Sequence, residues 1–285
     1  MSNPILPTNG THELVERYTD TIIKLKRKQN VVRNFFNRDY VGDPKAGAVK
    51  FTKRNTEVAV ANYNIEAGAA LTQSATEYVD ALINNNLAVN ELIDGYEAAA
   101  VPDNLIAQRL DSAAFSMGRQ QELDAIAVLE DANTGATVET ANTATAAANV
   151  YSSIVESISQ ITRLGIPKET LVVVIPDATE VKLLTDEKYS NTAAVTGAQL
   201  IRDGIIGGSS KINGVPVVVS SNLSAGVEWL VFSSWYAATA EEWVVPPTIN
   251  DIRNAAHIGA SALQGRMVYK DVLLDRTAAR IKKVA

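Results

Sequence analysis

The sequence predicts an α+β protein, and three observations lead to that fold class. The stretch from Pro102 to Ala132 carries an apolar stripe at helical spacing. Residues 46–94 instead contain runs in which apolar and polar residues alternate, as they do in β-strands. From Val150 onward, a helical pattern is followed by the unbroken apolar run Leu171–Ile175. Such a run is typical of a strand that is buried on both faces.

The composition is that of a folded protein. The chain has 285 residues, of which 46% are hydrophobic and 20% are charged, and it lacks cysteine. Disulfides, thiolate chemistry and cysteine-based metal sites are therefore excluded. No apolar run approaches the roughly 18–20 residues that a membrane span requires, and the N-terminus lacks the basic-then-apolar order of a signal peptide. We therefore expect no membrane partner and assembly in the cytoplasm.

The charge is distributed unevenly along the chain. Residues 1–54 contain eleven Lys and Arg against five Asp and Glu, a balance of +6, which leaves −12 for the remainder. Such a split suggests a basic arm that faces an acidic partner, either a neighbouring copy of the chain or a polyanion. A helix with a solvated basic face explains the same split.

The N-terminal segment is predicted to be extended over its first ten residues and helical from Glu13. Its apolar stripe consists of Leu14, Tyr18, Ile22, Leu25, Val32 and Phe36, and Gly42 and Pro44 end the pattern. An isolated amphipathic helix needs a surface that covers its stripe. We predict that Leu14, Tyr18, Ile22 and Leu25 pack on a neighbouring subunit, and that deleting residues 1–40 leaves a folded core that assembles poorly.

Residues 46–94 are predicted to form a long, thin β-arm. Four runs in this range have the pattern of strands, but few bulky apolar side chains lie among them, and a hairpin with so little to bury is marginally stable alone. We therefore expect the arm to lie against an adjacent subunit. Its cationic residues Lys50, Lys53 and Arg54 are candidate contacts to carboxylates of that neighbour.

The stretch Pro102–Ala132 is predicted to be one long helix, with Pro102 in its first turn. Fully helical, it would span roughly 45 Å at about 1.5 Å per residue, which is more than one compact core needs. A long helix in an ordinary domain is the simpler alternative. The Thr/Ala/Asn-rich residues Asn133–Ala148 then have the composition of a linker, and we expect a domain boundary there.

An α/β unit follows the expected linker. Val150, Ile154, Ile158 and Ile161 share one helix face that ends at Gly165. Leu171–Ile175 is the buried strand, and Asp177 with Glu180 resembles a capping box for a short helix. An Asn213-Gly214 turn should precede a strand at Val215–Ser220.

The last part of the chain alternates between strands and turns. Strands are expected at Glu228–Phe232, Gly265–Leu274 and Thr277–Lys283, and a strand or short helix at Trp235–Trp243. Pro246-Pro247 is expected to break the chain.

Candidate catalytic residues are few. His12 and His257 are the two histidines, and no zinc, phosphate-loop or nucleophile-elbow motif is present. Asp177 follows a buried strand, where ligand sites of open α/β sheets occur, although its expected role as a helix cap also accounts for it. We name no catalytic residue, cofactor or metal ligand. Trp229, Trp235 and Trp243 lie among glutamates, which favours core or interface roles over a base-stacking platform.

The order of segments resembles the major capsid protein of tailed bacteriophages, which has the Hong Kong ninety-seven-like fold. The similar stretches are the long helix with LDSAAFSMGRQQELDAIAVL, the run VVVIPDATEVKLL at Val172–Leu184, the element LIRDGIIGGSSKINGVPVVVSSNL at Leu200–Leu223, and the closing runs VFSSWYAATAEEW and LQGRMVYKDVLL. The resemblance covers nearly the whole length, and the Leu200–Leu223 element is its most specific part.

This resemblance implies a domain division. Residues 1–45 would be an N-terminal arm and residues 46–94 an extended β-hairpin loop. Residues 95–135 and 227–285 would be a peripheral domain with the spine helix, and residues 136–226 an α/β axial domain.

The implied function is self-assembly as hexamers and pentamers into an icosahedral virion shell around double-stranded DNA that is held without sequence reading. A separate scaffolding protein and a portal are the further partners implied. Two other functions stay open from the residues alone. One is a small-molecule α/β enzyme that uses Asp177 and the Gly204–Gly208 loop, and the other is a nucleic-acid-binding protein that uses the basic N-terminal arm.

Overall fold

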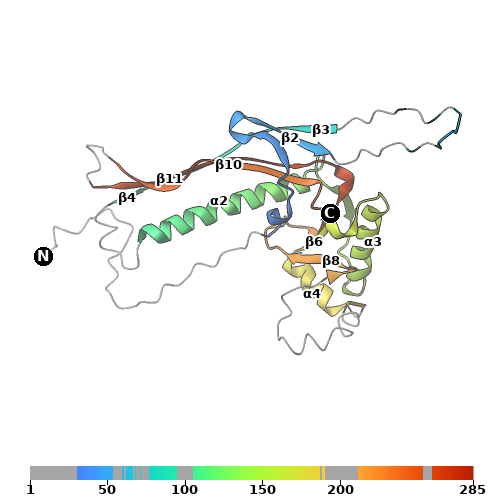
Figure 1. The fold of residues 1–285 in the computed structure, drawn as a ribbon. Coiled ribbons are helices and arrows are strands. Elements are labelled where there is room, and N and C mark those ends of the chain that lie inside the picture. The colour runs from blue at the N-terminus through green and yellow to red at the C-terminus, as the bar shows by residue number, and fades with distance from the viewer. Residues whose placement is uncertain are drawn as a thin grey trace, which may run out of the picture. The chain divides into compact units, whose positions relative to one another are not determined.

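The computed structural model describes residues 31–53, 60, 62–66, 68, 71, 77–94, 105–186, 188–189, 211–252 and 259–284. The chain forms two compact units, the larger of which contains residues 28–86, 118–243 and 268–285. The described residues of the smaller unit are 87–94, 105–117, 244–252 and 259–267. The α+β fold class predicted from the sequence is confirmed, since helices and strands both contribute to the larger unit (Figure 1).

A six-stranded mixed sheet lies at the centre of the larger unit. Its order is β5-β12-β9-β6-β8-β7. In chain order, the strands are β5 (Thr137–Ala141), β6 (Leu171–Ile175), β7 (Lys211–Ile212), β8 (Val215–Val219), β9 (Val227–Ser233) and β12 (Ala279–Val284). The pairs β5–β12 and β6–β8 are parallel, whereas β9 runs antiparallel to both of its neighbours. The sheet thus takes strands from both sequence ranges that were expected to form the peripheral and axial domains.

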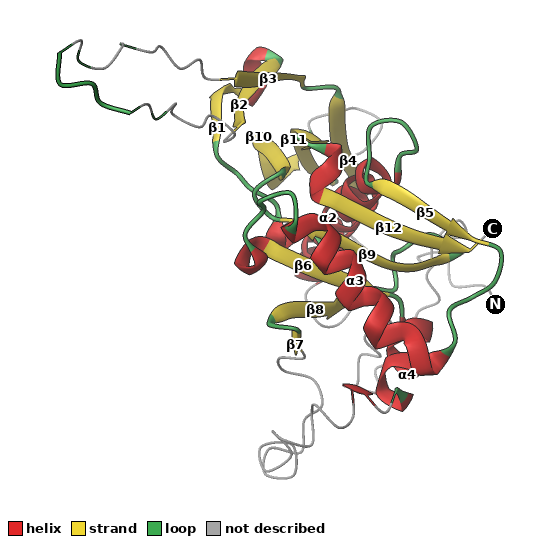
Figure 2. Ribbon diagram, turned by 90° about the vertical axis from the view of Figure 1, so that its right-hand side faces the viewer, coloured by secondary structure: helices red, strands yellow, loops and turns green. Residues whose placement is uncertain are grey.

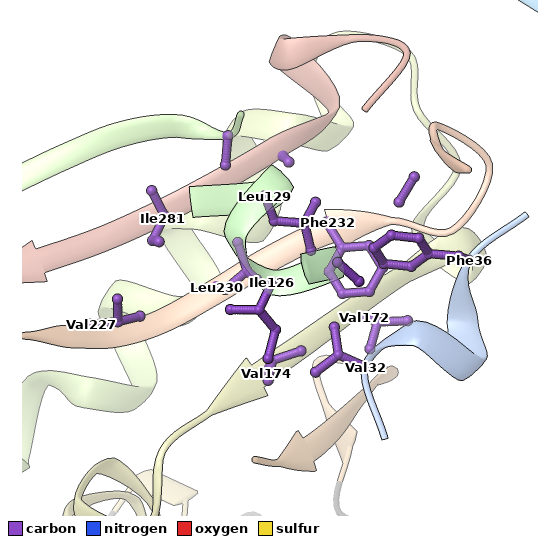
Figure 3. Close-up of a cluster of buried hydrophobic side chains, with 14 residues drawn as sticks. Val32, Phe36, Ile126, Leu129, Val172, Val174, Val227, Leu230, Phe232 and Ile281 are labelled. Atoms are coloured by element: carbon purple, nitrogen blue, oxygen red, sulfur yellow. The ribbon is translucent and has the colours of Figure 1, made fainter. Parts of the chain in front are cut away.

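Each face of this sheet buries a different helix. Val172 and Val174 of β6 point toward one apolar cluster, and Val173 and Ile175 point toward another, because side chains alternate along a strand. The first cluster contains Ala125, Ile126 and Leu129 of helix α2 (Leu105–Glu130) and is shown in Figure 3. The second contains helix α3 (Val150–Thr162), which lies across the sheet in Figure 2.

Several elements of the larger unit are as predicted. The four apolar residues that were predicted to share one face of α3, namely Val150, Ile154, Ile158 and Ile161, are all buried, and all five residues of β6 are buried as well. The turn between β7 and β8 has positive φ angles at Asn213 (53°) and Gly214 (85°), as a tight hairpin of the primed type requires.

The residues between α2 and α3 do not form the predicted linker. Thr137–Ala141 is strand β5, which pairs in register with β12. Further along, the backbone N–H and the hydroxyl of Thr145 both donate to the buried Glu228 carboxylate, at 2.8 and 2.6 Å. The composition is that of a loop, but long-range partners supplied by β12 and Glu228 order the segment.

Helix α4 (Asp177–Thr185) is present, but its predicted capping box is not. The N-cap residue is Pro176, and no side chain caps the helix. Asp177 is therefore the first helical residue, where its negative charge still complements the helix dipole.

A second sheet in the larger unit has the order β1-β2-β3. Its strands are β1 (Tyr40–Asp43), β2 (Ala48–Lys53) and β3 (Glu77–Leu82), and a short 3-10 helix, Pro44–Ala46, joins the first two. Val49 and Phe51 of β2 and Ala81 of β3 are buried with Ala238 and Ala240. The expectation that the arm lacks bulky side chains for a core is thus wrong at its base, because Phe51 alone supplies a large buried group.

The last predicted strand of the arm belongs to a different sheet. Residues Asn85–Ile93 form β4, which joins β10 (Ala237–Asp251) and β11 (Ser261–Leu273) in the order β10-β11-β4. The run Leu87–Ile93 therefore pairs with the closing strands and not with β2 or β3. Most of the remaining predicted run, residues 57–63, lies outside the described residues.

Helix α2 confirms the predicted long helix over Leu105–Glu130, while the first three residues of the prediction lie outside the described ranges. Its residues up to Met117 belong to the smaller unit and those from Gly118 to the larger. In the smaller unit, Ala113 is buried with Ile93 of β4 and Leu263 of β11.

Pro246-Pro247 does not break the chain, because both prolines lie inside β10. Strand β10 is at the edge of its three-stranded sheet, and an edge position tolerates proline, which cannot donate a backbone hydrogen bond. Gly265 of β11 makes room for the pair, since a Cβ atom there would lie 3.1 Å from the Cα of Pro247.

Candidate assembly surfaces

The first candidate surface is the β2–β3 pair of strands, which has one ion pair on each face because Lys50 and Lys53 have opposite parity along β2. Lys50 lies opposite Asp80 and Lys53 opposite Glu77 in the strand register, and their Nζ–carboxylate distances are 3.5 and 3.4 Å. Both lysines thus have carboxylate partners in their own chain. Exposed pairs of this kind contribute about 0.2–1 kcal/mol each. Contacts of Lys50 and Lys53 with a neighbour stay a prediction, and Arg54 lies outside the described residues.

The second candidate surface is the loop between β2 and β3. Four large apolar side chains are described in this loop, and Val60, Ile65 and Leu71 are each more than nine-tenths exposed, with Tyr63 73% exposed. Part of the loop forms a turn, in which the backbone N–H of Gly68 donates to the Asn64 carbonyl at 2.8 Å and Gly68 has a φ of +71°. Large apolar side chains that are this exposed in one loop indicate a surface that another molecule covers.

The third candidate surface is the N-terminal arm, of which the structure describes only the part from residue 31 onward. Residues 31–37 are called the root of the arm. Leu14, Tyr18, Ile22 and Leu25 lie outside the described residues. The predicted helix does not continue through Val32 to Phe36: the chain there forms the short 3-10 helix η1, Arg33–Phe35. Val32 and Phe36 are buried in their own subunit, where Phe36 packs edge-to-face on Phe232 with ring centroids 5.7 Å apart (Figure 3).

Polar contacts hold the same root from the other side. The backbone amides of Val31, Val32 and Arg33 all donate to the carboxylate of Glu122 on α2, at 3.0, 2.8 and 2.9 Å. A carboxylate that is remote in sequence therefore satisfies these amides, and this is the physical reason why residues 31–33 need no preceding helical turn.

Arg33 extends this polar cluster into the two closing strands. Its guanidinium donates to Asp271 (3.1 Å), Glu241 (2.5 Å) and Thr239 (2.7 Å), and it lies over the ring of Tyr269, 5.4 Å from the centroid. Burial disfavours the charged guanidinium, but Asp271 and Glu241 outweigh burial and raise the pKa of Arg33. Burial raises the pKa of Asp271, against the opposing attraction of Arg33.

Tyr269 completes the cluster on the α2 side. Its hydroxyl donates to the carboxylate of Asp124, and burial, together with that hydrogen bond, raises the pKa of Tyr269 well above its usual value. The phenol therefore stays a hydrogen-bond donor at physiological pH. One turn of α2, η1 and two strands are joined through one set of buried and half-buried charges.

This cluster was not predicted from the sequence, although the strand pattern contained a signal for it. Asp271 has the same parity along β11 as the buried residues Leu263, Met267 and Tyr269, so it must point inward with them. A charge on the apolar side of a strand predicts a buried partner of opposite charge.

Comparison with known proteins identifies the kind of protein to which these surfaces belong. A family model described as phage capsid protein matches residues 91–281. The chain belongs to the phage capsid protein family. Among curated proteins, none matches the chain significantly.

Solved capsid structures share its fold. A chain from Mycobacterium phage Che8 is 20% identical, with 97% of this chain and 98% of that chain covered and a TM-score of 0.71. The capsid of Cyanophage P-SCSP1u is 14% identical, with coverages of 95% and 93% and a TM-score of 0.69. The mature capsid of bacteriophage PhiM1 is 13% identical, with coverages of 95% and 92% and a TM-score of 0.65.

The chain is accordingly a structural major capsid protein, a component of the virion capsid that self-assembles into its shell. The family is structural, which favours a non-enzymatic role. Asp177 is exposed at the start of α4, and Gly204–Gly208, His12 and His257 lie outside the described residues. In the described part of the chain, no group of three or more His, Cys, Asp or Glu side chains could hold a metal ion.

Two further expectations concern membranes and bases. None of the helices in the described ranges is long and apolar enough to cross a membrane. Trp229 is buried and donates to the hydroxyl of Ser157 at 3.2 Å, so this capsid protein uses it as a core residue and not as a stacking surface for bases.

Proposed function

We propose that copies of this capsid protein form hexamers and pentamers, and that each subunit binds its neighbour mainly through the apolar residues of the β2–β3 loop. The observation that supports this mode most directly is the near-complete exposure of Val60, Ile65 and Leu71 in that loop. An isolated soluble subunit gains nothing from exposing them. A neighbouring copy is the partner available at every position of a closed shell.

Magnitudes favour these apolar residues over the two ion pairs of the β2–β3 strands. Complete burial of a Val, Ile or Leu side chain stabilises a contact by about 1.5–3 kcal/mol. An exposed ion pair adds about 0.2–1 kcal/mol, and the carboxylates of Asp80 and Glu77 already pair with Lys50 and Lys53. The apolar contact therefore supplies most of the affinity, and Lys50, Lys53 and Arg54 adjust its orientation.

The N-terminal arm is the second proposed contact. Its apolar stripe of Leu14, Tyr18, Ile22 and Leu25 would pack on an adjacent subunit, and its basic residues would face the acidic remainder of a neighbouring chain. A charge balance of +6 over residues 1–54 against −12 elsewhere favours that arrangement.

The remaining partners follow from the proposed shell. Packaged double-stranded DNA would be held by confinement and counter-ions without base reading. A separate scaffolding protein and a portal would guide closure, and assembly would take place in the host cytoplasm.

The test is assembly of the purified full-length chain, followed by negative-stain electron microscopy and light scattering. Ile65→Asp combined with Leu71→Asp should abolish rings and shells, because each aspartate would be buried without a partner. Asn62→Asp combined with Asn64→Asp is the matched control: both asparagines lie exposed in the same loop, and the two changes add the same two negative charges without removing apolar surface. Normal shells from the double variant, or equal loss in the control, would contradict the apolar contact.

A further inference from the structure

The root of the N-terminal arm is fixed by one buried side chain of α2. Glu122 is fully buried, and its two carboxylate oxygens accept the backbone N–H groups of Val31, Val32 and Arg33 at 2.8–3.0 Å. Three consecutive amides on one carboxylate form a strong, charge-assisted site. Glu122 thus binds the backbone itself and does not depend on which side chains the arm carries.

The anchored backbone has further support on both sides. Arg33 donates to Asp271, Glu241 and Thr239, while Val32 and Phe36 enter the apolar cluster beneath the sheet. The N–H of Asn37 then donates to the Ala237 carbonyl at 2.7 Å. The position and direction of the chain are therefore defined over residues 31–37, at the root of the arm.

We propose that Glu122 is the positioning residue of the N-terminal arm: by holding residues 31–33 on α2, it sets the point and direction at which the arm leaves the subunit. This inference rests on the proposed contact between the arm and an adjacent subunit. A segment that leaves from a fixed root is presented to its partner site at a higher effective concentration than one that leaves from a free root. Glu122 therefore promotes assembly without touching the neighbour.

Glu130→Gln is the matched control for Glu122→Gln. Both glutamates lie on α2, and both accept a backbone amide, since Glu130 accepts the N–H of Ser224 at 3.1 Å. Only Glu122 holds the arm. In Glu122→Gln, the new NH₂ group faces backbone N–H donors, so at least one hydrogen bond to a charged acceptor is lost. The loss of such a bond changes the equilibrium between the bound and the released states of residues 31–33 by roughly ten- to hundredfold.

The first measurement is hydrogen exchange of the amides of residues 31–33 in the unassembled full-length subunit. These amides should be protected in the unmodified chain and should exchange about tenfold or more faster in Glu122→Gln, but not in Glu130→Gln. Unprotected amides in the unmodified chain overturn the proposal without the use of any variant.

The second measurement is shell yield in a double-mutant cycle with a full-length arm variant, in which Leu14, Tyr18, Ile22 and Leu25 are all changed to Ala. Glu122→Gln alone should reduce the yield at least tenfold, and should reduce it no further in the arm variant, because both changes remove the same contact. If Glu122→Gln lowers the shell yield of the arm variant by the same factor, Glu122 acts only through subunit stability and the proposal is wrong. Normal shells from Glu122→Gln alone would also overturn the proposal. Normal shells from the arm variant would instead refute the proposed function of the arm.

Discussion

Phe51→Ala tests whether the base of the extended loop belongs to the core of its own subunit. Phe51 is fully buried in β2 and packs edge-to-face on Tyr40, with ring centroids 6.1 Å apart. Its removal leaves a cavity lined by Val49, Ala81 and Ala238. Replacement of a buried Phe by Ala costs about 3–5 kcal/mol. At about 2–4 °C per kcal/mol for a domain of this size, the melting temperature should fall by roughly 6–20 °C.

The assay is thermal unfolding of the unassembled subunit followed by near-ultraviolet circular dichroism. Tyr78→Ala is the control, because Tyr78 of β3 is exposed and lies opposite Thr52, on the other face of the same pair of strands. It should change the stability by less than about 0.5 kcal/mol. Equal melting temperatures for Phe51→Ala and the unmodified chain would refute the reasoning. They would indicate that the base of the loop packs on a neighbouring subunit and not in its own core.

Three further predictions concern charge, pH and backbone space. Lys50→Glu should weaken the β2–β3 pair by about 0.2–1 kcal/mol, because it places two negative charges opposite each other. Adding Asp80→Lys should restore the melting temperature. If this double variant still forms no shells, Lys50 contacts a neighbouring subunit. Burial raises the pKa of Asp271 against the attraction of Arg33, so the folded chain retains a proton that the unfolded chain releases, and the stability from this group is lost as pH rises through the folded pKa. Denaturant titrations from about pH 4 upward should therefore show that Asp271→Asn removes that part of the decline in stability. Gly135→Ala should destabilise the subunit by about 1–3 kcal/mol in chemical denaturation, since its Cβ would lie 2.5 Å from a backbone carbonyl oxygen at the end of α2.

The elements that the sequence predicted correctly are those whose causes are local. The period of α3 places four apolar residues on one face, and Gly165, with a φ of +84°, follows its end. The primed turn at Asn213-Gly214 likewise depends only on residues that tolerate positive φ. Helix α2 combines good helix formers with a long stripe, and its recognition required no knowledge of its partners.

The errors arise where a distant partner decides the structure. Residues 31–36 have helical periodicity, yet Glu122, 90 residues away from Val32, takes their amides. Thr137–Ala141 has the composition of a loop but gains a strand partner in β12, at the other end of the chain. Periodicity within a window contains no information on either partner.

The residues of the candidate assembly surfaces likewise divide into those with local causes and those that depend on distant partners. The pattern of β2 and β3 predicted strands, but the pairing that places Lys50 beside Asp80 depends on a register that the two sequences do not specify alone. The Arg33 cluster was missed because its members come from segments up to 238 residues apart. Resemblance to capsid proteins supplied the order of domains, which the residues by themselves left open.

The two prolines of β10 have a consequence for how copies of this protein meet. Consecutive residues of a strand direct their backbone N–H positions to opposite sides, so one proline removes a hydrogen bond toward β11 and the other leaves the outer side of the strand without a donor. A stray strand from another molecule would find that side unable to complete a ladder. Capsid subunits gather at high local concentration before they close into a shell, and continuous strand addition would draw them into fibres. Pro246 and Pro247 thus disfavour strand addition at this point of the β10 edge.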